Sequence, residues 1–236
     1  MAIILGLETA TNICSVALTN DGKLIAIRES EGVKEHSLAL TNYIAEVIAE
    51  AGMEYNQIDA IAVSMGPGSY TGLRIGVSSA KGLAYALDKP IIAVSTLKAM
   101  AWQALQLYKR EKRELNNILL CPMLDARRME VYTALFDQHL NEIETVNALV
   151  VTEDVFNAFA GKEIVYFGEG ALKCKSVFET KNNHNFLDGI TLSAYAVCML
   201  AENDYKSGNF ADTAYCEPFY LKEFVAGKPR VKGLYQ

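Results

Sequence analysis

The chain has 236 residues, 51% of them hydrophobic and 21% charged, which is enough to bury the core of two fused lobes. Its formal net charge of −6 argues against tight, unaided nucleic-acid binding, because phosphate binding normally needs a basic face. The five cysteines include no C-x-x-C pair, so we expect reduced thiols rather than a zinc or redox motif. No stretch approaches the roughly 20 apolar residues of a membrane span, and we expect a cytoplasmic protein without membrane association.

The first half of the chain predicts three strands followed by alternating helices and strands. The strands are apolar or alternating runs at 3–8, 15–19 and 24–28, and Asn20-Asp21-Gly22 predicts a hairpin turn between the last two. Apolar residues at helical spacing predict helices. These cover residues 37–51, 71–87 and about 96–113, with short buried strands at 58–64 and 91–94 between them.

The second half begins again with strands and then changes to mixed helix and strand. Strands are predicted at 118–124, 130–136, 142–151 and 163–167, with a short helix near 153–159 and a final helix at 191–206. We expect the tail from residue 226 to be loose. Two halves of this kind predict an α/β fold with two similar lobes, 1–113 and 114–236. Each lobe would hold a mixed sheet flanked by helices, with a cleft between the lobes.

The most informative stretch is the glycine-rich run from residue 66 to residue 76, Gly-Pro-Gly-Ser-Tyr-Thr-Gly-Leu-Arg-Ile-Gly. It joins a buried strand to a helix, where backbone N–H groups can converge on an anion. Gly66 and Gly68 permit a positive φ or a close backbone approach, and Ser69 can cap the helix. A tight turn followed by close helix packing remains an alternative, because the spacing matches neither the dinucleotide fingerprint nor the P-loop.

The same eleven residues resemble the hallmark of the TsaB (YeaZ) family. Other segments also resemble the family and occur in its order: residues 5–11 and 14–18 of its first hairpin, 125–132 of its second lobe, 168–171, and 218–221 near the end. The resemblance covers residues 3 to about 221. It implies two RNase H-like lobes of the actin/hexokinase (ASKHA) superfamily.

The resemblance also implies a function in tRNA modification. Proteins of this family support a catalytic TsaD-type paralogue, which forms N6-threonylcarbamoyladenosine (t6A) at adenosine 37 of tRNA. In the paralogue, a His-x-x-x-His metal element follows the strand that corresponds to 91–94. Thr96 and Met100 stand at those two places here, and neither is a credible metal ligand. The resemblance therefore implies a non-catalytic subunit without a metal site.

Partners and cofactors follow from the same resemblance. It implies binding to the TsaD-type subunit and to a TsaE-type ATPase, with a homodimer possible in isolation and tRNA contact only through the complex. We expect no cofactor bound by this chain alone, and ATP or ADP only at an interface of the complex. His36, His139 and His184 are isolated in the sequence, so we expect ordinary surface or capping histidines.

Candidate site residues fall into two groups. The predicted anion or nucleotide site consists of Glu8, Gly66, Gly68, Ser69 and Arg74, where Glu8 corresponds to the acidic first-strand residue of superfamily kinases and ATPases. The predicted partner-binding face is a small-residue stripe with its apolar neighbours on the helix 71–87: Tyr70, Gly72, Leu73, Gly76 and Ala80.

Both groups leave alternatives open. The stripe could pack internally against the sheet, and Glu8 could be a polar residue at a strand end. Arg127 and Arg128 could grip an anion or a partner carboxylate. An ASKHA-type ATPase or small-molecule kinase is the alternative function, whereas a peptidase is disfavoured because the chain has no H-E-x-x-H motif.

Overall fold

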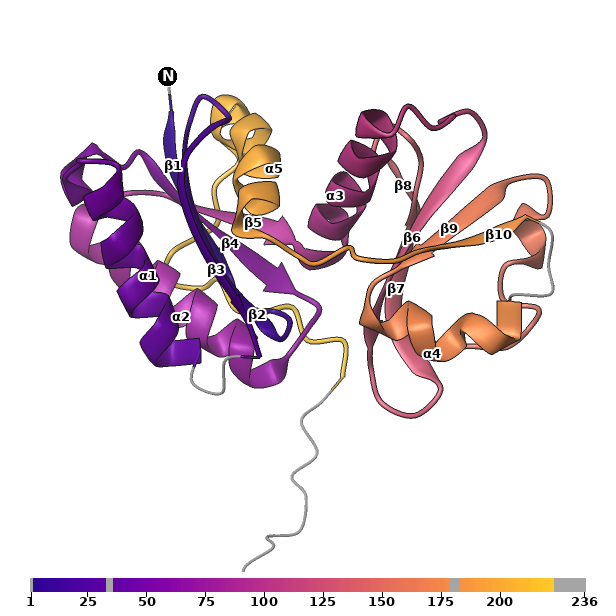
Figure 1. Cartoon of the computed structure of the whole chain (residues 1–236). Coiled ribbons are helices and arrows are strands. Elements are labelled where there is room, and N and C mark those ends of the chain that lie inside the picture. The colour runs from indigo at the N-terminus through magenta and orange to yellow at the C-terminus, as the bar shows by residue number, and fades with distance from the viewer. Residues whose placement is uncertain (1, 33–35, 179–182, 223–236) are drawn as a thin grey trace, which may run out of the picture.

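The computed structural model describes residues 2–32, 36–178 and 183–222, and places two α/β lobes side by side (Figure 1). The sheet of the first lobe has the strand order β3-β2-β1-β4-β5. Its strands are β1 (Ile3–Glu8), β2 (Ile13–Asn20), β3 (Lys23–Glu31), β4 (Ala60–Gly66) and β5 (Ile91–Ser95). Strand β1 is antiparallel to β2 and parallel to β4, so the sheet is mixed as predicted. The predicted hairpin turn is also present, with positive φ at Asp21 and Gly22.

The sheet of the second lobe repeats the same arrangement. Its order is β10-β9-β6-β7-β8, which from the β8 edge is again third, second, first, fourth and fifth. The strands are β6 (Ile118–Asp125), β7 (Glu130–Phe136), β8 (Glu142–Val150), β9 (Glu163–Phe167) and β10 (His184–Leu187). In both lobes an antiparallel meander is followed by two parallel strands. This confirms the predicted pair of RNase H-like lobes.

The helices arrange these sheets in the order helix, sheet, helix, sheet, helix. α1 (His36–Glu50) and α2 (Tyr70–Leu87) cover the outer face of the first sheet, and α4 (Glu169–Phe178) covers the outer face of the second. α3 (Thr96–Arg110) and α5 (Ala194–Ser207) lie between the sheets (Figure 1). In the part of the chain that the structure describes, no helix is long and apolar enough to span a bilayer.

The layer of α3 and α5 forms one core with both sheets. Leu97 of α3 and Val197 of α5 belong to the same buried cluster as Ile4 of the first sheet and Leu120 of the second. Gly6 of β1 lets α5 approach closely, because a Cβ at that position would lie 2.5 Å from the sulfur of Cys198. Helix α5 therefore packs on the first sheet, although the sequence assigned its residues to the second lobe.

Three elements differ from the sequence-based prediction. Helix α4 and strand β10 were not predicted, and the helix expected near 153–159 is only a short 3₁₀ turn, Asn157–Phe159. Gly170 explains part of the difference: it reads as a helix breaker, but a Cβ there would lie 2.8–2.9 Å from the backbone of Leu124. Close packing of α4 on β6 thus requires glycine at residue 170, and this glycine is the reason that the sequence did not predict a helix there.

The loop after β1 interlocks with the start of α2. The Thr9 hydroxyl donates a 2.7 Å hydrogen bond to the carbonyl of Gly72, and the Ser69 N–H donates one of 2.7 Å to the carbonyl of Ala10. A Cβ on Gly72 would overlap the Thr9 carbonyl oxygen, and one on Gly76 would overlap the Thr9 hydroxyl. The small-residue stripe of α2 therefore packs inside the chain, as the alternative interpretation had it.

Glu8 lies beneath this interlock, at the end of β1. Its side chain is fully buried; one carboxylate oxygen accepts a 2.5 Å hydrogen bond from the Ala10 N–H, and the other contacts the Ser64 hydroxyl. Burial raises the pKa of Glu8 to about 7, and these hydrogen bonds only partly oppose the effect. The carboxyl group is thus a buried polar group whose environment favours the neutral form.

We predict opposite effects of two glycine substitutions on α2. Gly72→Ala should lower the free energy of unfolding by about 1–3 kcal/mol, because the added methyl group must displace the Thr9 backbone. Gly82→Ala on the same helix should raise it by up to ~1 kcal/mol, since nothing lies within 4 Å and alanine favours helix. Urea denaturation measures both. Equal changes in the two variants would contradict the interlock.

We also predict that Glu8 makes stability depend on pH. The carboxyl pKa is higher in the folded chain than the ordinary 4.5, so its contribution is complete below pH 4.5 and is lost as the pH rises to about 7. The loss should be about 3 kcal/mol relative to Glu8→Gln, which keeps an acceptor for Ala10 but cannot ionise. The measurement is the free energy of unfolding of both proteins from pH 4 to 8. A constant difference between them would refute the assignment.

Candidate functional site

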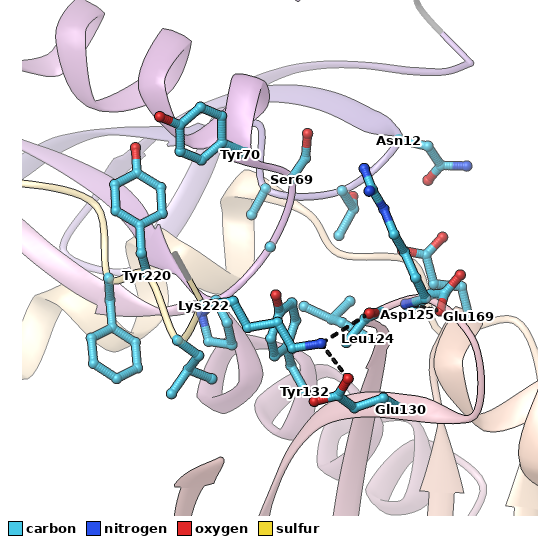
Figure 2. A pocket seen from close by; sticks show the side chains of 18 of the residues that line it. Asn12, Ser69, Tyr70, Leu124, Asp125, Glu130, Tyr132, Glu169, Tyr220 and Lys222 are labelled. Carbon is cyan, nitrogen blue, oxygen red and sulfur yellow. Dashed lines mark hydrogen bonds and ion pairs between the residues drawn. The ribbon is translucent and has the colours of Figure 1, made fainter. Parts of the chain in front are cut away.

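A cleft of about 880 Å³ opens between the two lobes (Figure 2). The first lobe contributes residues 10–12 after β1 and 67–70 at the start of α2, and the second contributes 124–128 at the end of β6 with Glu130, Tyr132 and Glu169. Residues 219–222 of the C-terminal segment form a third wall. A second hollow of about 510 Å³ shares Thr11, Asn12, Leu124 and Glu169 with the cleft and continues it toward residues 186–192. The ends of β1 and β6, the first strands of their sheets, therefore face the same space.

The wall from the first lobe is built by the glycine-rich turn. Gly66 has a φ of +120° and is followed by a cis peptide bond to Pro67. Its N–H donates a 3.1 Å hydrogen bond to the hydroxyl of Thr96, at the start of α3. Ser69 caps α2, as predicted, by accepting a 3.2 Å hydrogen bond from the Gly72 N–H. The turn is thus fixed at both ends and presents Ser69 and Tyr70 to the cleft.

The wall from the second lobe carries both paired and exposed charges. Asp125 forms an ion pair with Lys173 and accepts a 2.8 Å hydrogen bond from the Arg127 N–H, and both hold its pKa below the usual value. Partial burial, together with the nearby negative Asp125, raises the pKa of Glu169. Arg127 and Arg128 are exposed and adopt left-handed backbone conformations, with φ of 71° and 52°. These arginines are the cleft cations that an anionic group would meet.

The C-terminal wall of the cleft contacts both lobes. The Tyr220 ring lies 5.0 Å from the Tyr70 ring, and its hydroxyl accepts a 3.2 Å hydrogen bond from Nε of Arg74. Lys222 points across the cleft to the carboxylate of Glu130, as the dashed lines in Figure 2 show. Sequence reasoning did not single out Lys222. A lysine near the chain end carries no local signal that distinguishes it from a solvated surface residue.

The predicted anion site is only partly assembled. Gly68 and Ser69 line the cleft, but Glu8 lies buried beneath it and Gly66 is buried behind the turn. Arg74 is exposed and stacks on the Tyr70 ring, 4.3 Å from the ring centroid, without lining the cleft. Polar side chains that line the cleft together with Ser69 include Asn12, Arg127 and Lys222.

The predicted partner-binding face needs a correction. Gly72, Leu73, Gly76 and Ala80 are buried within the chain, because this side of α2 packs on Thr9 and on the first sheet. Only Tyr70 of that group reaches the surface of the cleft. The outward side of the same helix layer carries other apolar side chains, with Leu38 of α1 59% exposed and Tyr85 of α2 87% exposed.

Thr96 and Met100 have structural contacts. Thr96 is fully buried and its hydroxyl accepts the hydrogen bond from the Gly66 N–H. Met100 packs in the core shared by the two lobes.

His184 differs from the expected surface histidine. It is buried on β10, and its Nδ1 lies 2.7 Å from the Tyr166 hydroxyl. Among residues 2–32, 36–178 and 183–222, no three His, Cys, Asp or Glu side chains gather as a metal-ligand set.

Comparison with known proteins identifies relatives of this chain. The family described as TsaD, tRNA N6-adenosine threonylcarbamoyltransferase, matches residues 26–192. The tRNA threonylcarbamoyladenosine biosynthesis protein TsaB of Haemophilus influenzae is 30% identical, over 95% of each chain. The protein of the same name from Escherichia coli is 33% identical, over 95% of this chain and 96% of its own.

A solved structure agrees with these matches. YeaZ from Pseudomonas aeruginosa superposes with a TM-score of 0.78 at 27% identity, over 94% of this chain and 100% of that one. The likeness therefore covers both lobes and the cleft between them, rather than one lobe alone. With full-length sequence matches and a full-length structural match in hand, we conclude that the chain belongs to the TsaB (YeaZ) family.

Proposed function

We propose that this chain is a non-catalytic subunit in the formation of N6-threonylcarbamoyladenosine at adenosine 37 of tRNA, where it binds and supports a TsaD-type catalytic subunit. The full-length relatives are named as TsaB proteins of threonylcarbamoyladenosine biosynthesis, which supports a role in that pathway. The match of residues 26–192 to the TsaD family supports an origin shared with the catalytic subunit.

The main support for the non-catalytic role is that the side chains of Thr96 and Met100 are buried and make structural contacts. By resemblance, these places hold the metal-binding histidines of the catalytic paralogue. Here the Thr96 hydroxyl is committed to the Gly66 N–H at 3.1 Å, and the Met100 thioether is 2% exposed within the shared core. A thioether and a committed hydroxyl are poor ligands for the hard or borderline metals of hydrolytic and transfer enzymes.

The outward face of α1 and α2 is the surface that we assign to the partner. Leu38 and Tyr85 are large apolar side chains that the fold leaves 59% and 87% exposed, and exposed tyrosines are frequent anchors of protein interfaces. The proposal also includes a TsaE-type ATPase as a third component, ATP or ADP only at an interface of the complex, and tRNA contact only through the complex. The net charge of −6 fits the last point, since direct phosphate binding favours basic chains.

An ASKHA-type ATPase or small-molecule kinase is the second candidate, because the cleft could admit a nucleotide by volume. Its charges argue against this function. Glu8, which would organise metal and phosphates, is fully buried with a raised pKa, and Lys222 is paired with Glu130 rather than free for a phosphate. We therefore favour the partner subunit.

We predict that threonylcarbamoylation of tRNA by the purified catalytic paralogue and its companions will require this chain, while the chain alone stays inert. Omitting it should lower the rate at least ~10-fold, equivalent to about 1.4 kcal/mol of lost transition-state stabilisation. The measurement is t6A formed per minute, beside ATP hydrolysis by the isolated chain. Modified tRNA or sustained ATP turnover with this chain alone would favour the second candidate instead.

Matched variants locate the surface in the same assay. Tyr85→Arg changes an exposed α2 side chain and should raise the concentration of this chain needed for half-maximal activity. Val150→Arg on β8, 60% exposed, is the control and should behave as the parent protein. Equal effects of both substitutions would place the partner elsewhere.

We predict that Thr96 contributes to stability and not to chemistry. Thr96→Val keeps the shape but leaves the buried Gly66 N–H without an acceptor, which should lower the free energy of unfolding by about 1–3 kcal/mol. The maximal rate of the reconstituted reaction should change less than about two-fold, and Thr96→Ser should restore stability. A large loss of maximal rate with unchanged stability would mean that Thr96 acts in the reaction.

A further inference from the structure

The two lobes meet along two different lines. On one side they share the apolar layer of α3 and α5, and on the other they face each other across the open cleft. Figure 1 shows these helices between the sheets, and the yellow C-terminal segment passing the first lobe toward the second. We call residues 219–222, the part of this segment that lines the cleft, the strap.

The strap is held by the first lobe. Upstream of it, the Ala211 N–H donates to the carbonyl of Ile91 at 2.9 Å, and Lys81 of α2 donates to the carbonyls of Ala214 and Cys216 at 2.9 and 3.1 Å. The strap itself begins with the Phe219 N–H, which donates to the carbonyl of Met65 at 2.7 Å. These contacts, together with the Tyr220 ring on Tyr70, anchor the strap on the first lobe.

The end of the strap reaches the second lobe through Lys222. Its ammonium group pairs with the carboxylate of Glu130 on β7 and donates to the carbonyl of Ala126 at 3.2 Å. It also lies 5.7 Å from the centroid of the Tyr132 ring. Lys222, which is anchored on the first lobe, thus contacts three groups of the second lobe.

We propose that the strap is a latch: Lys222 holds the lobes at a fixed separation on the cleft side, and its release from Glu130 widens the cleft. The pair can influence such a motion because it joins the lobes within the cleft, beside the apolar layer about which the lobes can shear or rotate. The Lys222 and Glu130 side chains are 35% and 26% exposed, so water and salt compete with the contact. A pair of this kind is strong enough to bias an opening and weak enough to release.

The test measures the distance between the lobes by pulsed electron paramagnetic resonance on the full chain. Spin labels go on Ala86→Cys of α2 and Ser176→Cys of α4, both exposed, in a Cys216→Ser background, because the other four cysteines are buried. Dilution with unlabelled protein removes distances between copies. The parent should show one dominant distance with a smaller, longer component.

Lys222→Met, which keeps the length of the side chain but not its charge, should enlarge the long-distance component about two- to five-fold. Glu130→Ala should do the same from the other lobe, and Lys222→Arg should keep the parent distribution. Lys206→Met removes an ion pair with Glu202 inside α5 and is the matched control, expected to leave the distances unchanged. Raising the salt concentration should shift the parent toward Lys222→Met.

Circular dichroism confirms that each variant is folded, which we expect because each altered pair includes at least one side chain that is a third or more exposed, Lys222 in one and Lys206 in the other. Parent-like distances in both Lys222→Met and Glu130→Ala would overturn the latch. So would an equal widening in Lys206→Met or Lys222→Arg, because the effect would then not depend on a cation at residue 222.

Discussion

The apolar layer of α3 and α5 fixes the rest of this structure, because both sheets bury side chains against it at once. Ile4 and Ile92 pack on it from the first sheet, and Leu120 and Val165 from the second. Each such side chain contributes about 1.5–3 kcal/mol when fully buried, so neither sheet can leave the layer without exposing a large apolar face. The two lobes therefore share one apolar core, and a cut after residue 113 would separate α5 from the sheet that it covers.

This arrangement also decides where a ligand or a partner can act. The inner faces of both sheets are used by the shared layer, and the glycine stripe of α2 is used by Thr9. The cleft at the ends of β1 and β6 and the outward face of α1 and α2 remain accessible. In the cleft, Asp125 is paired with Lys173 of the same lobe, and Glu130 is paired with Lys222 of the C-terminal segment. The two acidic groups that are paired in this way leave the exposed Arg127 and Arg128 as the cations of the second-lobe wall.

Glu8 shows how the loop after β1 determines the environment of an acidic side chain at a strand end. Here residues 9 and 10 close over the carboxyl group, and the glycines of α2 allow that closure. Desolvation then favours the neutral acid, as the pKa of about 7 indicates. The carboxyl group is therefore part of the interlock and does not line the cleft.

The sequence by itself determined the types and order of most elements: β1, β7 and β9 have the predicted bounds, Ser69 caps α2, and the two strand meanders predicted two similar lobes. Such features depend on neighbours a few residues away, which periodicity and capping patterns record. Only the tertiary structure decided that α5 covers the first sheet, that the glycine stripe faces Thr9, that His184 is buried, and that Lys222 meets Glu130. Those contacts join residues as far apart as Gly6 and Cys198, and no local pattern specifies which buried faces meet.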